Sequence, residues 1–277
     1  MIFRILLLLI VLGVISPLLA FTGERIVSLK PNVTDILFDL GRGDEVVGVT
    51  SFCTLPSGVP EREVVANYMN VDVERVLLLK PTVVFGSKEN SSVKEIGFLR
   101  ERGLRVELFP FRTVSETVAS IRSMAAVLKI PSRGDEAAGE IEKDLERLRM
   151  KGIGGGKVLS VMVVVGTKPL VVVGEDNLID DLLDLFGVRN VVGKSHLKYP
   201  TWSVEQMIAE KPDVIVDLAM GSEKGVSERG RVWYGQFPSV PAVREGRVHF
   251  LDMNDFRASK RILKGAAELH KILVEGR

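Results

Sequence analysis

Cysteine and histidine are almost absent from this chain of 277 residues. Its single cysteine, Cys53, can form no internal disulfide, and it cannot by itself build a cysteine-based metal site or hold an iron–sulfur cluster. The three histidines, His196, His249 and His270, lie far apart and lack the spacing of metal ligands. We therefore expect no resident metal and no cofactor, although His196 stays open as a contact to a metal ion within a bound molecule.

An excess of charge of one sign is also lacking, since 37 basic residues are balanced by 36 acidic ones. No global electrostatic field draws such a chain to nucleic acid or to a membrane surface, and we expect no nucleic-acid partner. There is no nucleophile elbow, and the glycines at 152–156 follow a predicted helix rather than the strand that precedes a phosphate-binding loop. We therefore expect no catalytic residue and no enzyme, and keep a two-lobed α/β enzyme as an alternative.

A long apolar stretch is present at the N-terminus. Arg4 supplies a positive charge, residues 5–15 are almost wholly Leu, Ile and Val, and a small-residue exit ends at Ala20. This layout predicts a signal peptide at 1–20, and hence a periplasmic or other extracytoplasmic location. The stretch is shorter than the ~20 residues of a membrane-spanning helix, and no cysteine follows it to carry a bacterial lipid anchor. A retained segment that anchors an interaction domain to the membrane is the alternative.

The chain also repeats itself. Residues 32–40 and 177–185 each begin with asparagine, continue with acidic residues, and carry apolar residues at helical spacing. Both then lead to Val-Val-Gly, at 46–48 and 191–193. Each copy predicts a helix that begins at the asparagine and is followed by a strand.

A second repeat is tighter. Residues 73–84 (Val-Glu-Arg-Val-Leu-Leu-Leu-Lys-Pro-Thr-Val-Val) correspond to residues 204–215 (Val-Glu-Gln-Met-Ile-Ala-Glu-Lys-Pro-Asp-Val-Ile). Each copy predicts a short amphipathic helix ended by Lys-Pro, because proline cannot continue the helical hydrogen bonds, and then a buried strand. A tyrosine precedes each copy, at Tyr68 and Tyr199. Two repeats in the same order predict two related α/β lobes.

The segment between the two predicted lobes is predicted to be helical. Thr113 and Glu116 have the spacing of a capping box, and Gly134 opens a highly charged helix that reaches about residue 150. A single long helix between the lobes makes a stiff hinge. The predicted division is a signal peptide (1–20), an N-terminal lobe (22–112), connecting helices and linker (113–156), and a C-terminal lobe (157–277).

Four segments carry a family resemblance. Residues 25–35 (Arg-Ile-Val-Ser-Leu-Lys-Pro-Asn-Val-Thr-Asp) are similar to an opening strand and a Ser-Pro-x-x-Thr-Glu turn, and residues 47–52 to a second strand that runs into an aromatic residue. Residues 68–84 and 257–262 complete the set. Together they resemble the periplasmic receptors for vitamin B12, haem and ferric siderophores, the helical-backbone class of importer-linked binding proteins. The resemblance implies an α/β fold with two Rossmann-like lobes, each with a central, mainly parallel sheet, joined by one long backbone helix.

The same resemblance implies a function. Such a protein is the monomeric substrate-binding component of an ABC importer, which captures a metal chelate between its lobes and delivers it to the membrane permease. The vitamin B12-binding branch, closest in pattern, packs its ligand between aromatic side chains, and Phe52, Tyr68 and Tyr199 keep that character. Ser87 and Val171 stand where that branch has tryptophan and phenylalanine. A corrinoid, haem and a ferric siderophore therefore all remain candidate ligands.

Three basic residues complete the predicted ligand site. Lys30 replaces a small polar residue at the family's first turn. Arg112 and Arg257 follow the ends of predicted strands, where open α/β sheets bind ligands, and either could pair with an anionic siderophore or a haem propionate. Trp233 and Tyr234 form an aromatic pair in a loop, which either overhangs the cleft or packs beneath the loop.

Two glutamates are predicted to contact a partner protein. Glu74 and Glu205 occupy the first turns of the repeated helices, where a carboxylate also complements the helix dipole. In the family such a glutamate, one on each lobe, docks onto arginines of the transporter. We therefore expect Glu74 and Glu205 to act in docking to the permease.

Overall fold

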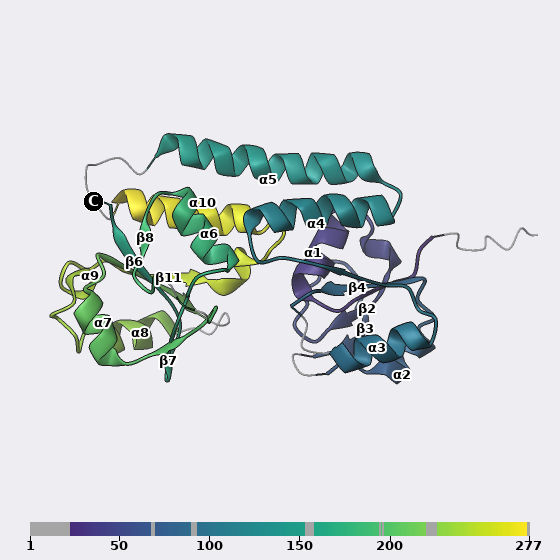
Figure 1. Cartoon of the computed structure of the whole chain (residues 1–277), viewed down its shortest axis with the longest axis horizontal. Helices are drawn as coiled ribbons and strands as arrows, with labels where there is room; N and C mark the ends of the chain where they lie inside the picture. The colour runs from purple at the N-terminus through teal and green to yellow at the C-terminus, as the bar shows by residue number, and fades with distance from the viewer. Residues whose placement is uncertain are drawn as a thin grey trace, which may run out of the picture.

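The structure, a computed structural model, describes residues 23–67, 70–89, 93–152, 158–193, 195, 197–219 and 226–275. These residues form two α/β lobes joined by a pair of long helices, which confirms the predicted fold class (Figure 1). The predicted signal peptide lies outside the described residues. Within the part of the chain that the structure describes, none of the helices combines the length and the apolar character needed to span a bilayer.

The N-terminal lobe is built on a sheet of five parallel strands in the order β3-β2-β1-β4-β5. The central strands β1 and β4 are buried along their whole length, as expected of a parallel sheet with both faces covered. The elements of this lobe are β1 (Ile26–Ser28), α1 (Pro31–Asp39), η1 (Gly43–Glu45), β2 (Val46–Thr50), β3 (Glu63–Ala66), α2 (Val73–Leu78), β4 (Val83–Ser87), α3 (Val93–Glu101) and β5 (Val106–Phe109).

The C-terminal lobe has a mixed sheet in the order β11-β10-β6-β7-β9, with β8 paired to β6. Strand β6 is parallel to β10 and β8, whereas β7 runs antiparallel to both β6 and β9. The elements are β6 (Ser160–Thr167), β7 (Leu170–Val172), α6 (Leu178–Leu185), β8 (Arg189–Asn190), β9 (Thr201–Trp202), α7 (Val204–Glu210), β10 (Val214–Ala219), α8 (Val226–Tyr234), α9 (Pro241–Arg244), β11 (Val248–Asp252), η2 (Met253–Phe256) and α10 (Ile262–Glu275).

The connecting helices are α4 (Val114–Val127) and α5 (Pro131–Lys151). Pro131 occupies the first turn of α5, where its missing N–H needs no partner, so the helix begins before the predicted Gly134. Gly134 instead brings α5 close to α4, because a Cβ at this position would lie 2.4 Å from the Cβ of Ala125. Helix α5 runs along the top of both lobes, above α4 and α10 (Figure 1).

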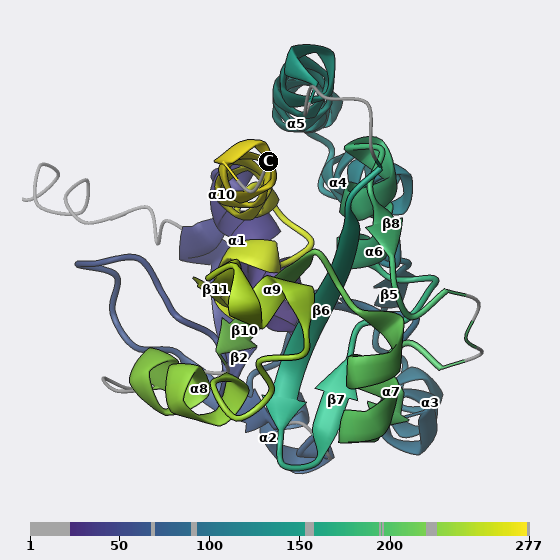
Figure 2. The ribbon, with the colours of Figure 1, turned by 90° about the vertical axis from the view of Figure 1, so that its left-hand side faces the viewer.

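A shared hydrophobic core underlies both lobes. It joins α1 and β1 of the first lobe, α4 and α5, and β6, α6 and α10 of the second. Each sheet packs its other face against a smaller core of its own. In the side view the three helices α4, α5 and α10 gather at one end of the molecule, away from α2 and α7 (Figure 2). The lobes are therefore bound together by side-chain packing as well as by the chain.

The first repeat is only partly confirmed. Asn177 caps α6, since its side chain accepts hydrogen bonds from the N–H groups of Ile179 and Asp180. Asn32 does not cap α1, because that helix already begins at Pro31 and its N-cap is Lys30. Residues 46–48 lie in β2 as predicted, but 191–193 form a turn beyond the two-residue strand β8.

The second repeat is confirmed in detail. Helices α2 and α7 each begin at the predicted valine and end before the Lys-Pro pair. Lys80 and Lys211 both adopt the left-handed backbone conformation, with φ of 46° and 49°. The buried strands β4 and β10 follow. The two lobes therefore repeat the same helix ending as well as the same sequence.

Candidate functional site

A cleft of about 750 Å³ lies between the lobes. Its first wall is formed where the strands β1 to β5 end, at the carboxyl edge of the parallel sheet. Its second wall is formed by segments that follow β7, precede β9 and follow β11. This is the edge at which open α/β sheets bind ligands.

The cleft has aromatic side chains on both walls. Phe52 follows β2 and is 47% exposed, and Tyr199 precedes β9 and is 45% exposed. Two of the three predicted aromatic residues, Phe52 and Tyr199, therefore line the cleft, one from each lobe. Tyr68 lies outside the described residues, although its neighbour Asn67 lines the cleft.

Lys30 contributes a partly buried cation to the first wall. It lies at the N-cap of α1, where its side chain makes no capping hydrogen bond. Burial lowers the pKa of the Lys30 ammonium group, and the charge of Glu89 opposes this effect. The Glu89 carboxylate accepts hydrogen bonds from the hydroxyl of Ser87 and from the N–H of Phe111, at 3.4 Å in the second case. A cation and an anion thus lie together on this wall.

Arg112 lines the cleft between two carboxylates. Its Nη2 lies 2.8 Å from Oε1 of Glu116 on α4, and its Nη1 lies 2.9 Å from Oδ2 of Asp176 in the other lobe. The backbone N–H of Arg112 also donates to Glu116, at 2.8 Å. The predicted capping box is therefore incomplete, because Glu116 accepts from Arg112 while the Thr113 hydroxyl still accepts from the Glu116 N–H.

Arg257 links the cleft to the junction of the lobes. Its Nη2 donates to Oδ1 of Asn254 at 2.6 Å and to the carbonyl of Phe52 at 3.3 Å. Its Nη1 lies 3.5 Å from Oδ2 of Asp35 on α1, an oxygen that also accepts from Nε of Arg261 at 3.0 Å. Residues after β11 therefore bind directly to the first lobe.

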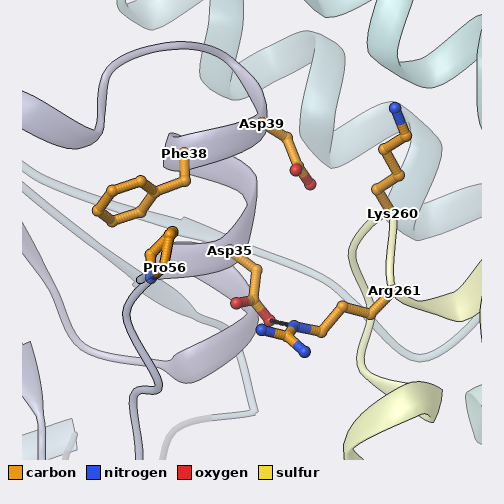
Figure 3. A pocket seen from close by; sticks show the side chains of 6 residues that line it. All are labelled: Asp35, Phe38, Asp39, Pro56, Lys260 and Arg261. Carbon is orange, nitrogen blue, oxygen red and sulfur yellow. Dashed lines mark hydrogen bonds and ion pairs between the residues drawn. The ribbon is translucent and has the colours of Figure 1, made fainter. Parts of the chain in front are cut away.

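A second cavity of about 310 Å³ lies on this junction (Figure 3). Asp35 and Asp39 of α1 line it together with Lys260 and Arg261, and the Asp35–Arg261 ion pair crosses it. Burial and then the charge of Asp35 raise the pKa of Asp39 to about 6. Burial also raises the pKa of Asp35, against the opposing effect of the two arginines.

Trp233 and Tyr234 were predicted to lie in a loop, but they form the end of α8, and neither lines the cleft. Tyr234 is buried and donates to Oδ2 of Asp217 at 3.0 Å, and Trp233 packs edge-on against it with ring centroids 4.8 Å apart. The pair therefore serves in packing, as in the second alternative, but it packs from a helix and not beneath a loop. Ser87 lines the cleft, whereas Val171 is absent from its lining.

Cys53 lies in the wall of the cleft among hydroxyl groups. Its Sγ is 3.1 Å from Oγ1 of Thr34 and 3.3 Å from Oγ1 of Thr50. His196 lies outside the described residues. Across the described ranges, no three side chains of the histidine, cysteine, aspartate and glutamate types gather closely enough to hold a metal ion.

The two glutamates predicted to dock occupy equivalent, exposed positions. Glu74 is the second residue of α2, and Glu205 is the second residue of α7. Both helices lie on the side of the molecule opposite α5, one on each lobe (Figure 1). Hydrogen bonds from its own backbone and from Ser203 lower the pKa of Glu205.

Some polar residues of the cleft were not predicted. Glu89, Lys198 and Asn254 all line it. Glu89 and Asn254 share one signal with the predicted arginines, since each lies just beyond the end of a strand, β4 or β11. Lys198 precedes the predicted Tyr199, and no pattern in the sequence distinguishes it from a solvated surface lysine.

Comparisons with known proteins all point to periplasmic binding proteins. The profile of the periplasmic binding protein family matches residues 26–254. The vitamin B12-binding protein of Vibrio cholerae is 26% identical over 232 residues, which cover 84% of this chain and 82% of that protein. The vitamin B12-binding protein of Yersinia pestis is 26% identical over 250 residues, covering 90% and 86%.

Solved structures show the same fold. The periplasmic vitamin B12-binding protein BtuF of Vibrio cholerae gives a TM-score of 0.82 at 24% identity, covering 92% of this chain and 98% of that one. The periplasmic haem-binding protein RhuT from Roseiflexus gives a TM-score of 0.80 at 25% identity, covering 92% and 99%. Structural relatives with different named ligands therefore share these two lobes.

Proposed function

The chain belongs to the periplasmic binding protein family, and we propose that it captures a metal chelate between its lobes and delivers it to the permease of an ABC importer. The chelate is a corrinoid, haem or a ferric siderophore. The observation that carries this proposal is the interlobe cleft, which has a half-exposed aromatic side chain on each wall, Phe52 and Tyr199.

The chemistry of the cleft suits such a ligand. A volume of about 750 Å³ falls within the range of ~300–1,000 Å³ that small-molecule sites occupy. Aromatic side chains stack on flat conjugated rings, and each stacked pair contributes ~0.5–1.5 kcal/mol beyond the buried area. Lys30 supplies a hydrogen-bond donor for polar groups at the ligand's edge, and Arg112 and Arg257 line the same cleft beside their carboxylate partners.

Delivery requires a second surface, and Glu74 and Glu205 are the residues proposed to form it. Both are exposed first-turn glutamates, one on each lobe, and both lie outside the lining of the cleft. Exposed ion pairs are weak, at ~0.2–1 kcal/mol each. Two that are far apart nevertheless orient a partner and speed its encounter.

The location and assembly follow from the same role. We expect the first twenty residues to direct export, and we expect the mature protein to act as a monomer outside the cytoplasmic membrane. N-terminal sequencing of the exported protein tests the first expectation. A retained N-terminus would favour the membrane-anchored alternative.

A retention experiment tests ligand capture. The purified protein is mixed in turn with cyanocobalamin, haemin and a ferric catecholate, desalted, and its visible spectrum recorded. We expect one of the three characteristic spectra to remain with the protein, at one ligand per chain. The double variant Phe52→Ala, Tyr199→Ala, which lacks the aromatic ring on each wall, should retain less chelate than the natural protein. Loss of all three chelates on desalting, with titrations that also show no binding, would exclude the proposal.

A further inference from the structure

The guanidinium group of Arg112 is bound by carboxylates at each of its nitrogens. Its Nε and Nη2 donate to Oε1 of Glu116 at 3.3 and 2.8 Å. Its Nη1 donates to both oxygens of Asp176, at 3.3 and 2.9 Å. A ligand carboxylate would use these same donors, so it meets an edge that is already occupied.

Asp176 belongs to the opposite lobe and is held firmly beside the cleft. It lies between β7 and α6, in the left-handed backbone region with φ of 60°. The next residue, Asn177, donates through Nδ2 to the carbonyl of Gly174 at 2.7 Å and caps α6 with its side-chain oxygen. The short loop therefore presents the Asp176 carboxylate to Arg112 across the boundary between the lobes.

The other cations of the cleft also have carboxylates beside them. Arg257 lies 3.5 Å from Asp35, and the charge of Glu89 acts on Lys30. Hydrogen bonds from Arg112 and, to a lesser extent, the charge of Lys198 lower the pKa of Glu116. The four cations that line the described part of the cleft are Lys30, Arg112, Lys198 and Arg257, and the four carboxylates beside them are Asp35, Glu89, Glu116 and Asp176.

We infer that Asp176 is a specificity-determining residue, which occupies Arg112 in place of a ligand carboxylate and so favours chelates with an uncharged, amide-rich edge. This inference rests on the proposed function. A carboxylate on the ligand gains little at Arg112, because it must displace another carboxylate and then lie near it. An uncharged amide edge meets no such repulsion. With its N–H edge occupied, Arg112 keeps its flat face for stacking on a planar ligand.

A second role for the Arg112–Asp176 pair predicts a different result. The N–H of Val114 donates to Oδ2 of Asp181 at 2.6 Å, so the start of α4 is also tied to α6 nearby. If Asp176 serves only to brace the lobes, its removal changes their relative position and alters the affinity for every ligand alike. A specificity role changes the ratio of affinities between an anionic and a neutral ligand.

The test compares two probes on the variant Asp176→Asn. Asparagine keeps the size of the side chain and tolerates the left-handed backbone, but it carries no charge. Haemin carries propionate groups, whereas the edge of cyanocobalamin carries uncharged amides. By calorimetric titration we expect haemin to bind roughly two- to five-fold more tightly to the variant, as the removal of one exposed charge allows, and cyanocobalamin affinity to stay unchanged.

Two further variants sharpen the comparison. Glu116→Gln should shift the haemin-to-cyanocobalamin ratio in the same direction, because it removes the other carboxylate from Arg112. Glu146→Gln is the matched control, since it breaks an equally short surface ion pair on α5, with Arg149 at 2.7 Å. The gain in Asp176→Asn should also shrink as salt is raised, because salt screens exposed charges.

The outcomes distinguish a failure of the specificity role from a failure of the proposed function. Equal changes for both probes, or no change for either, in Asp176→Asn overturn the specificity role alone. Failure of the natural protein and of all variants to bind either probe or the ferric catecholate overturns the proposed function, and this inference with it. A changed ratio in Glu146→Gln as well would show a nonspecific effect of net charge and would also overturn the assignment to Asp176.

Discussion

Removing the ring of Tyr199 should weaken ligand binding and leave the fold intact. The residue is 45% exposed in the cleft, which leaves about 90 of the ~200 Å² of such a side chain for a ligand to cover. Complete cover contributes about 2 kcal/mol at ~25 cal/mol per Å², and a flat ligand on one ring face reaches about half of this. Tyr199→Ala should therefore cost about 1 kcal/mol, or roughly a five-fold loss of affinity.

The backbone around Tyr199 should not move. The carbonyl of Lys198 accepts a hydrogen bond from the N–H of Gly174 at 2.9 Å, and the carbonyl of Pro200 accepts one from Val172 at 3.0 Å. The residues on either side are thus tied to β7 and the loop after it. We therefore expect the melting temperature of Tyr199→Ala to stay close to that of the natural protein.

Calorimetric titration with the retained chelate measures the effect. Tyr199→Phe keeps the ring and should bind normally, and Val232→Ala, at a 74% exposed residue outside the lining of the cleft, is the matched control. Phe52→Ala should cost a similar amount, since Phe52 is exposed to the same extent, and Tyr68→Ala is also expected to weaken binding several-fold. Unchanged affinity in both Tyr199→Ala and Phe52→Ala would refute the aromatic site.

Further predictions concern docking, capping and pH. The double variant Glu74→Lys, Glu205→Lys should keep its ligand affinity but lose most uptake into vesicles, whereas Glu210→Lys at the other end of α7 should not; full uptake by the double variant would exclude the docking role. Asn177→Ala should lower the free energy of unfolding in urea by ~1–2 kcal/mol, because it uncaps α6, while Asn32→Ala should be nearly neutral, and equal losses would contradict this reasoning. The pKa of Asp39 is raised from 3.8 to about 6, so the ionised side chain destabilises the protein above pH 6 and this cost vanishes below pH 3.8. Asp39→Asn should therefore stabilise the protein at neutral pH, by at most ~1 kcal/mol because the residue is more than a third exposed and water screens its charge. Thermal melts of the variant and the natural protein at neutral pH and below pH 3.8 measure this pH dependence. A stabilisation found only in acid would contradict the reasoning.

The repeats made the lobes predictable because they are local patterns. The Lys-Pro endings fix where α2 and α7 end, and the strands after them begin with three apolar residues each. Reliance on a local pattern also explains why Asn32 was wrongly predicted to begin α1. The asparagines of the two copies match, but Pro31 takes the first position of α1 and moves its start ahead of Asn32.

The charge pairing in the cleft could not be predicted in this way. Arg112 and Arg257 line the cleft, as expected from their positions after strand ends, but their charge partners were not predicted. Asp176 lies 64 residues from Arg112 in the sequence, and Asp35 belongs to a helix of the other lobe from Arg257. Periodicity and spacing carry no information on which distant side chains meet. The availability of a charge for a ligand therefore depends on tertiary structure.

Residues 253–261, near the C-terminal end of the chain, contact α1 and the segment after β2 in the first lobe. Arg261 meets Asp35 across 226 positions of sequence, and Arg257 meets the carbonyl of Phe52 across 205. Contacts of such separation form late, because the intervening chain must first be closed into a loop. We therefore expect the first lobe to stay incomplete until β11 has formed. Since a shared core also spans both lobes, the protein should melt as one cooperative unit, and a shortened chain that ends before Met253 should fail to form the cleft.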